Sequence, residues 1–499
     1  MNENAALEAL SKALAKPLPE AITKAFTSPA TATTGLAEYN LEEGARLMFP
    51  IDTPLRNIIP RETGQAGIQA NWRSIIAVNP NLTQIGLSEG NRGGYNNYTE
   101  VDVFAKFVEC GMDDYVTWKA EAAAKGFESL DELAVQLLLQ ATMEAEEKNT
   151  LYNFGTSGLG TTPNPTVTPL TTGGTIVNQS GLLTVVALTA KGMVGSSVAN
   201  GVTIPYTRTN ADGTTDTING FSAAPSANTA ATTTGAGAVN SIQASVTPVP
   251  GAAGYAWFYG LAGSQLLAAI TSINSVLLTA PAAGTQNLTA LPATDKSNDT
   301  LLYDGLIAQM VQSAGLYGSG YGSYIQALPT GTIGTGSHLT SAGSGTGSIV
   351  EFDTAIYSFF NNHRLIPDTI WISGYDQKAI KALILNGNTN LAPFFRGPDN
   401  EVMAGARVKT YTNPIGYGNS DLELKVHPFL PQGMVLFTTS KLPYKLSNVK
   451  QIWKMNLRRE YYSILWPLRS RKYEYGVYFD GVLQHYFPAA MGMIYNIAP

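Results

Sequence analysis

Two stretches of alternating hydrophobic and polar residues in the first quarter of the chain predict a long β-hairpin. Ile68, Ala70 and Trp72 alternate with polar residues, the pattern continues through Ile76, and after a polar, glycine-rich tip it resumes at Val101. About eleven residues per arm at roughly 3.3 Å each give a ribbon about 35 Å long. Because a two-stranded ribbon alone is marginally stable, two alternatives stay open. The hairpin lies on a neighbouring subunit, or it folds back on its own core.

Leucine spacing after residue 129 predicts the longest helix of the chain. Ser129 and Glu132 have the spacing of a capping box, and the apolar residues that follow recur at helical intervals: Leu130, Leu133, Leu137, Leu138 and Ala141. The helix is expected to run to about Asn149, a length of about 30 Å. Three carboxylates near its far end predict a solvated helix face rather than a metal site: Glu144, Glu146 and Glu147.

Residues 161–290 differ sharply from the sequence on either side. Only four of them are charged, and Thr, Ala, Gly, Ser and Val dominate. Short alternating segments recur between turn signals, and Asn210 to Gly213 supplies a hairpin turn. This pattern predicts a separate module, an all-β sandwich of immunoglobulin-like or fibronectin type. With no cysteine in the segment, packing around Tyr255 and Trp257 is expected to hold it together.

Strands and helices alternate after residue 300, which predicts an α/β or α+β domain here and an α+β class for the whole chain. A helix is expected around 306–311, and a glycine-rich loop at 315–347 ends in Ser348, the predicted N-cap of the next helix. Residues 367–373 read as a buried strand that leads into another helix. The last stretch predicts a strand that turns at Asp480 and Gly481 and returns.

Composition narrows the possible functions. The 499 residues carry a net charge of −6, and only 14% of them are charged, so tight nucleic-acid binding is not expected. The single cysteine, Cys110, excludes an intrachain disulfide and is compatible with folding in a reducing cytoplasm. No uninterrupted apolar run reaches the roughly 18 residues of a membrane span, so no membrane segment is expected.

No motif predicts a catalytic, cofactor-binding or metal-binding residue. The four histidines are scattered, with no two at the spacing of a zinc protease. The glycine runs 318–322 and 343–347 lack the Lys-Ser/Thr ending of a phosphate loop. We therefore expect neither an enzyme nor a cofactor. Since catalytic sites can be discontinuous, an enzyme with a β-sandwich accessory module remains an alternative.

Basic and aromatic residues are interleaved between Lys450 and Arg471. This mixture is compatible with nucleic-acid binding through phosphate contacts and base stacking. We favour the alternative that these are strands whose Arg side chains bridge acidic neighbours across a subunit interface, where Arg, Tyr and Trp are enriched. Arg458 and Arg459 are accordingly predicted interface residues, together with Trp72 and Ile76 on one face of the hairpin and Arg92 near its tip.

Three segments carry a resemblance to a known family: 109–117, 365–373 and 473–496. They and the order of predicted elements resemble the tailed-bacteriophage major capsid proteins, whose shell fold is named for phage Hong Kong 97. The resemblance implies these parts: N-terminal arm, 1–63; E-loop hairpin, 64–105; peripheral domain with spine helix, 106–160; insertion, 161–290; return segment and glycine-rich loop, 291–347; axial domain, 348–440; and C-terminal β-stretch, 441–499.

The resemblance also implies a function. The chain is expected to self-assemble as hexamers and pentamers into an icosahedral virion shell around double-stranded DNA, with loose DNA contact and with portal, scaffolding or decoration proteins as partners. Assembly is expected in the bacterial host cytoplasm. A nanocompartment shell of the same fold and a phage tail or surface adhesin remain alternatives. The E-loop lysine that is cross-linked in the family's type member has no counterpart between Gly64 and Glu100.

Overall fold

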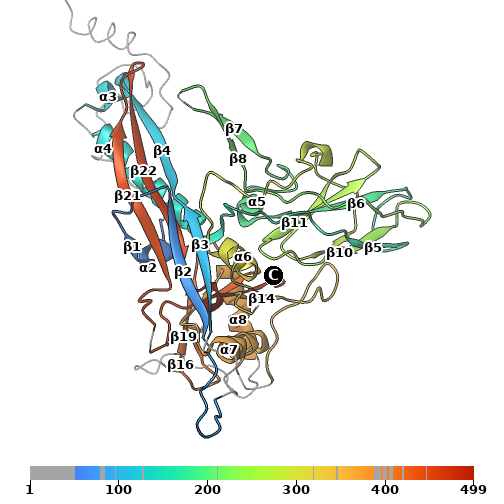
Figure 1. The fold of residues 1–499 in the computed structure, drawn as a ribbon. Coiled ribbons are helices and arrows are strands. Elements are labelled where there is room, and N and C mark those ends of the chain that lie inside the picture. The colour runs from blue at the N-terminus through green and yellow to red at the C-terminus, as the bar shows by residue number, and fades with distance from the viewer. Residues whose placement is uncertain are drawn as a thin grey trace, which may run out of the picture. The chain divides into compact units, whose positions relative to one another are not determined.

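The computed structural model describes residues 51–499 apart from 79–84, 96, 126–128, 211, 319, 344–346, 387–394, 397–401, 404–407, 419–420 and 446. The first fifty residues of the predicted N-terminal arm lie outside this description. The described residues form two compact units: 115–134 with 467–474, and 51–114 with 135–466 and 475–499. The described part contains both α-helices and several separate, mainly antiparallel sheets (Figure 1), which confirms the α+β class.

The predicted hairpin is confirmed. It consists of β2 (Gln69–Val78) and β3 (Tyr98–Lys106), antiparallel, with Trp72 opposite Val103. The register shifts between Ile75 and Ala77, so that Ile76 occupies a β-bulge. A bulge increases the local twist and re-aims the neighbouring side chains.

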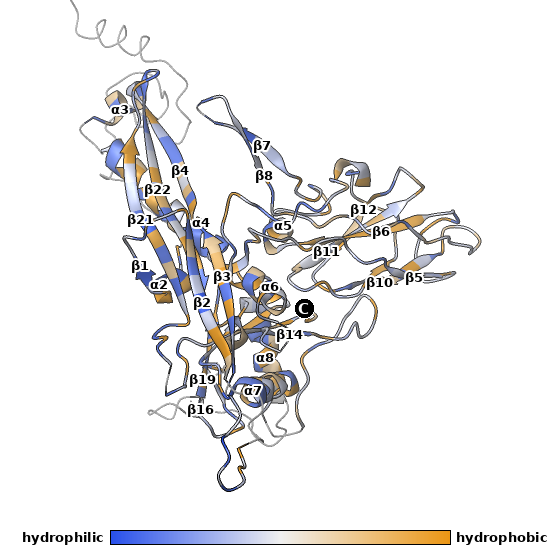
Figure 2. Ribbon diagram, in the orientation of Figure 1, coloured by the Kyte–Doolittle hydropathy of each residue, from blue (hydrophilic) through white to orange (hydrophobic). Residues whose placement is uncertain are grey.

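A four-stranded sheet joins distant parts of the chain in the order β1-β21-β22-β4. Its strands are β1 (Arg61–Glu62), β4 (Val108–Thr117), β21 (Trp453–Leu465) and β22 (Lys472–His485). Hydrophilic and hydrophobic bands alternate along β22 (Figure 2). The turn predicted at Asp480 and Gly481 is wrong, because β22 continues through both. Gly481 instead lies opposite Leu457 beside a register shift, where an added Cβ would come within 2.5 Å of a leucine methyl.

The predicted long helix is confirmed as α4 (Leu130–Tyr152), about 34 Å long. It continues past the predicted end at Asn149 because Leu151 and Tyr152 are buried in the same core as α6 (Leu306–Tyr317). In the smaller unit, α3 (Trp118–Ala124) begins at Thr117, whose hydroxyl accepts a hydrogen bond from the Ala120 amide at 3.3 Å. The Trp118 ring lies 6.2 Å from that of Tyr473.

Residues 161–290 contain two packed sheets. One has the order β13-β10-β5 and the other β12-β11-β6-β9. The bounds are β5 (Thr166–Leu170), β6 (Leu182–Leu188), β9 (Thr229–Ala230), β10 (Ser241–Ser245), β11 (Gly254–Gly260), β12 (Leu266–Thr271) and β13 (Ser275–Leu278). A separate hairpin, β7 (Tyr206–Thr209) and β8 (Thr215–Ile218), turns at the predicted Asn210–Gly213 segment (Figure 1).

Packing around Tyr255 and Trp257 holds the sandwich together, as predicted. Both side chains lie in one apolar cluster with residues of β6, β10 and β13. The Trp257 indole donates to the Thr271 hydroxyl at 2.9 Å, and the Tyr255 hydroxyl accepts from the Val249 amide at 2.8 Å. The sheet of β6 and β11 is apolar on its other face too, against Val202 and Leu291. The immunoglobulin-like classification stays a prediction.

A mixed six-stranded sheet, in the order β14-β23-β20-β15-β19-β18, builds the remaining core. Its strands are β14 (Tyr324–Ala327), β15 (Thr369–Ile372), β18 (Thr410–Thr412), β19 (Asp421–Val426), β20 (Val435–Thr438) and β23 (Gly492–Tyr495). The helices α7 (Val350–His363) and α8 (Gly374–Asn386) accompany it. Ser348 is not the N-cap of α7 as predicted; Ile349 takes that position without a side-chain bond.

The remaining short elements are α2 (Pro54–Ile58), α5 (Ala190–Val194), η2 (Leu288–Ala290), η3 (Pro488–Ala490), β16 (Phe395–Arg396) and β17 (Val402–Met403). No helix of the described part is long and apolar enough to cross a membrane.

The sandwich of residues 161–290 is hydrogen-bonded directly to the residue that follows β23. The Asn274 amide donates to the Asn496 side chain at 2.8 Å, and the Asn496 side chain donates to the Leu328 carbonyl at 2.8 Å. Asn496 has a φ of 64°, a left-handed conformation that asparagine tolerates better than most residues. The sandwich is therefore tied to β23 through buried amides as well as through its two chain connections.

Candidate functional site

The two faces of the β2–β3 hairpin have different environments. On the inner face the Trp72 ring makes an edge-to-face contact with Tyr486 at 6.5 Å, and the Ser74 hydroxyl donates to the Tyr486 carbonyl at 3.1 Å. Val103, opposite Trp72, is buried. The inner face of the hairpin therefore folds back on the core of its own chain, which is the second of the two alternatives stated above.

The outer face of the hairpin is exposed and partly apolar. We define it as Asn71, Arg73, Ile75, Tyr98, Glu100, Asp102 and Phe104, which alternate with the inner positions. Ile75, Tyr98 and Phe104 are 61%, 62% and 62% exposed. Arg73 and Glu100 form an exposed ion pair at 3.4 Å between the strands. Large apolar side chains grouped with charged neighbours are typical of a protein contact surface.

The structure places the predicted hairpin residues differently from one another. Trp72 and Ile76 are half-buried, and Trp72 contacts its own chain, while Arg92 lies exposed in the tip. Their role in subunit contacts stays a prediction. Sequence reasoning selected the face that carries tryptophan and passed over Ile75 and Phe104. The alternation defined two faces but held no signal for which one the chain would cover.

The two predicted arginines of β21 also differ. The Arg458 Nε lies 2.6 Å from an Asp480 carboxylate oxygen, and its guanidinium lies 5.3 Å from the Phe107 ring centre. Arg459 is exposed, with its guanidinium 5.3 Å from the Tyr462 ring centre. The acidic partner of Arg458 thus belongs to its own chain, whereas the outward-facing Arg459 remains a predicted interface residue.

The acidic cluster at the end of α4 is not a solvated face, and that interpretation is wrong. Glu146 and Glu147 are 1% and 0% exposed at their side chains. Glu146 pairs with Arg56 at 3.0 Å and Arg61 at 2.7 Å, and it accepts a hydrogen bond from the Tyr461 hydroxyl. Burial and the nearby Glu146 raise the pKa of Tyr461, so its hydroxyl remains a donor. The third carboxylate, Glu144, is more exposed than the other two and pairs with Lys148.

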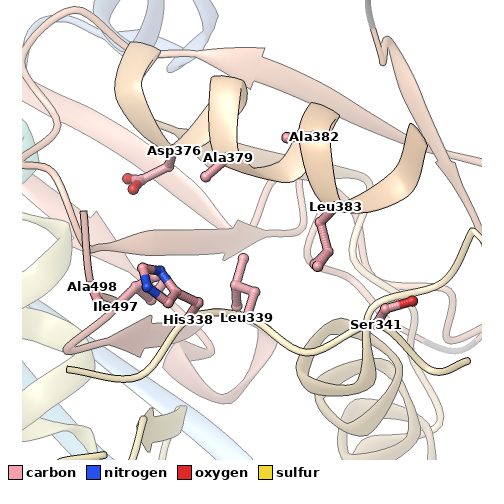
Figure 3. Close-up of a pocket in the computed structure, with 9 residues that line it drawn as sticks. All are labelled: His338, Leu339, Ser341, Asp376, Ala379, Ala382, Leu383, Ile497 and Ala498. Atoms are coloured by element: carbon pink, nitrogen blue, oxygen red, sulfur yellow. The ribbon is translucent and has the colours of Figure 1, made fainter. Parts of the chain in front are cut away.

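A cavity of about 450 Å³ lies between α8, the 338–341 segment and the C-terminal residues (Figure 3). Its walls are mainly apolar: Leu339, Ala379, Ala382, Leu383 and Ile497. Burial raises the pKa of Asp376 at one end, and its carboxylate accepts hydrogen bonds from the Ser373 hydroxyl at 2.7 Å and the Gly433 amide at 3.1 Å. Asp376 therefore fixes the start of α8.

The histidines are distributed over separate elements. His338 lines the cavity of Figure 3, whereas the others lie at the end of α7, after β19 and at the end of β22. Among the residues that the structure describes, no group of three or more His, Cys, Asp or Glu side chains is placed to hold a metal ion.

Comparisons with known proteins complete the description. No protein-family model matches the chain, and no curated protein matches it. Similar solved structures include the capsid of a native GTA particle (7% identity, 95% of this chain and 100% of that one, TM-score 0.42). The capsid of Myoviridae phage XM1 has 8% identity, coverages of 92% and 96%, and a TM-score of 0.39. The capsid of cyanophage P-SCSP1u has 10% identity, coverages of 94% and 99%, and a TM-score of 0.38.

Proposed function

We propose that this chain is a structural subunit that self-assembles into an icosahedral shell, the major capsid protein of a tailed bacteriophage. The observation that carries the proposal is the outer face of the β2–β3 hairpin. A two-stranded arm that packs one face on its own chain leaves Ile75, Tyr98 and Phe104 exposed on the other. Covering that face against a neighbouring copy removes apolar surface from water and supports the arm.

The proposed mechanism is additive association. Each contact between copies is weak, but closed symmetry lets many contacts form together, so a complete shell is far more stable than any one interface. In this proposal the copies are arranged as hexamers and pentamers, and the predicted interface residues contribute beside the outer face: Trp72, Ile76, Arg92, Arg458 and Arg459. The protein needs no catalytic group or cofactor for this role.

The surroundings of the shell belong to the same proposal. The shell would be part of the virion, assembled in the bacterial host cytoplasm, with portal, scaffolding or decoration proteins as partners. The net charge of −6 supports loose rather than tight contact with the packaged DNA. The insertion would be an accessory module of the subunit, and its tie to Asn496 supports a fixed placement on the subunit.

A charged residue on the outer face tests the proposal. Phe104→Asp places a carboxylate where a neighbouring copy would bury an aromatic ring, so we expect the yield of shells to fall by on the order of tenfold or more. The yield is measured by sedimentation and electron microscopy, and circular dichroism checks that the subunit stays folded.

Leu261→Asp is the matched control. Leu261 is also more than half exposed, but it lies in the turn between β11 and β12 of the insertion. This variant is expected to assemble like the wild type. Equal shell yields for both variants and the wild type would contradict the role of the outer face.

A further inference from the structure

Two buried carboxylates at the end of α4 hold a short segment that precedes the hairpin. We call residues 54–62 the strap; it comprises α2 and β1. Glu147 accepts hydrogen bonds from the backbone amides of Leu55 at 2.8 Å and Arg56 at 2.7 Å. Glu146 pairs with the side chains of Arg56 and Arg61. Each carboxylate thus contacts the strap twice.

The same carboxylates contact two other parts of the molecule. The His427 Nε2 lies 2.6 Å from a Glu147 oxygen, and the Tyr461 hydroxyl donates to Glu146. Since the Phe429 amide donates to His427 Nδ1 at 3.1 Å, the imidazole proton resides on Nε2 and is donated to Glu147. The strap, α4, β21 and the segment after β19 therefore meet at one pair of charges.

The bound strap and the two carboxylates, Glu146 and Glu147, stabilise each other because their charges compensate. A buried carboxylate is stable only when it is paired or hydrogen-bonded. Among the residues that the structure describes, removing the strap would leave Tyr461 as the hydrogen-bond partner of Glu146 and His427 as that of Glu147. The strap in turn brings two guanidiniums into a site where their side chains are only about 15% exposed.

The strap has further attachments beside the two carboxylates. Arg61 also pairs with Glu460 at 3.4 Å, and the Met455 amide donates to the Pro60 carbonyl at 2.8 Å. Leu55 and Ile59 are its buried apolar side chains, and β1 forms a two-residue parallel pairing with Met455 and Asn456 of β21. In addition, Lys454 contacts Glu62 at the surface. Because β1 occupies the outer position of the sheet, the bound strap also covers that edge of β21 against another strand.

From this arrangement we propose that the strap detaches and rebinds while the rest of the subunit stays folded. The charges of Glu146 and Glu147 hold it in its bound position. The inference concerns the single subunit and does not rest on shell assembly. Local openings of this kind occur in folded proteins at a free-energy cost below that of global unfolding.

The rate of trypsin cleavage after Arg56 and Arg61 measures how often the strap is detached, because both residues lie within it. The assay uses the soluble, unassembled full-length chain and follows new N-termini at Asn57 and Glu62 by mass spectrometry. Rates are divided by the rate of cleavage after Arg73, which is exposed on the hairpin. Glu146→Gln is expected to raise this ratio by on the order of tenfold, because Arg56 loses its acidic partner and Arg61, among the described residues, keeps only Glu460, at 3.4 Å.

Glu144→Gln is the matched control on the same helix. Its carboxylate pairs with Lys148 at 2.7 Å, away from the strap, so the ratio is expected to stay within about twofold of wild type. Glu147→Gln is expected to raise the ratio as Glu146→Gln does, and the double variant to raise it further.

Two results would overturn the proposal that the strap detaches separately. An unchanged ratio in the double variant would mean that the carboxylates do not hold the strap. Equal acceleration at every site, with loss of the helical circular dichroism signal, would mean that the strap cannot open separately from the core. Neither result bears on shell formation, which is measured by electron microscopy of the wild type.

Discussion

Cys110 is a nucleophile whose surroundings suppress its reactivity. Burial, with the charges of Glu146, Asp480 and Asp299 nearby, raises the pKa of the thiol to about 12. Because the reactive species is the thiolate, the folded protein is expected to react with a disulfide reagent at pH 8 at least about a hundredfold more slowly than the urea-unfolded chain. Spectrophotometric thiol titration checks this, and rapid stoichiometric labelling of the folded protein would refute it.

His485 couples stability to pH. Burial lowers the pKa of its imidazole to about 3, against about 6.5 in an unfolded chain. Below pH 6.5 the unfolded chain therefore binds a proton that the folded chain does not, and the free energy of unfolding falls as pH falls toward 3. By pH 5 this residue accounts for a loss of about 2 kcal/mol.

Replacing His485 removes that contribution. Between pH 7 and pH 5, His485→Gln is expected to lose about 2 kcal/mol less than wild type in its free energy of unfolding, as measured by urea denaturation. Parallel losses in the two proteins would mean that the imidazole is not kept neutral in the folded state.

Glu146 illustrates what residue-level sequence reasoning cannot reach. An acidic run at the end of an amphipathic helix is usually solvated, and nothing local distinguishes this one. Its partners, Arg56, Arg61 and Tyr461, lie 90, 85 and 315 positions away. Such burial is set by tertiary pairing, which a local pattern does not encode.

At the scale of elements, prediction succeeded where the pattern was periodic and local. The hairpin arms, α4 and the strand leading into α8 follow from side-chain spacing, which decides which face is buried. The turn at Asp480 and Gly481 failed because glycine has two uses in strands. It permits a turn, and it also permits the close approach that Gly481 makes to Leu457.

The junction between the sandwich of residues 161–290 and the C-terminal end of β23 is a second element-scale feature that the sequence did not predict. The Asn274 side chain donates to the Val246 carbonyl at 2.6 Å and to the Thr330 hydroxyl at 2.9 Å. It accepts from the Asn496 side chain at 3.1 Å, although the two asparagines lie more than 200 residues apart in the chain. Asn274→Ala would leave these buried groups unpaired.

The expected cost of Asn274→Ala is about 1–3 kcal/mol in the free energy of unfolding, measured by urea denaturation. Asn362→Ala, which removes an exposed bond to Ser358, is the control and is expected to cost less than about 0.5 kcal/mol. Similar small losses in both variants would show that the junction contributes little to holding the insertion.

At the scale of the whole molecule, the α+β class could be predicted from the sequence more fully than the contacts between its elements. The composition change at residues 161–290 coincides with a segment that forms two packed sheets, whereas its role as an insertion stays a prediction. The candidate contact surface was only half predicted: the hairpin was foreseen, but its exposed face carries Ile75 and Phe104 rather than Trp72. Packing of the inner face decides that choice, with Trp72 against Tyr486 and Ala70 and Ala105 against the core.

Electron microscopy of the purified wild-type chain tests the central proposal most directly. If the chain is a shell subunit, fields of the assembled protein contain closed particles of uniform diameter with icosahedral symmetry, built from hexamers and pentamers. A chain that remains monomeric, or forms only open fibres, under all conditions in which it stays folded would contradict the account.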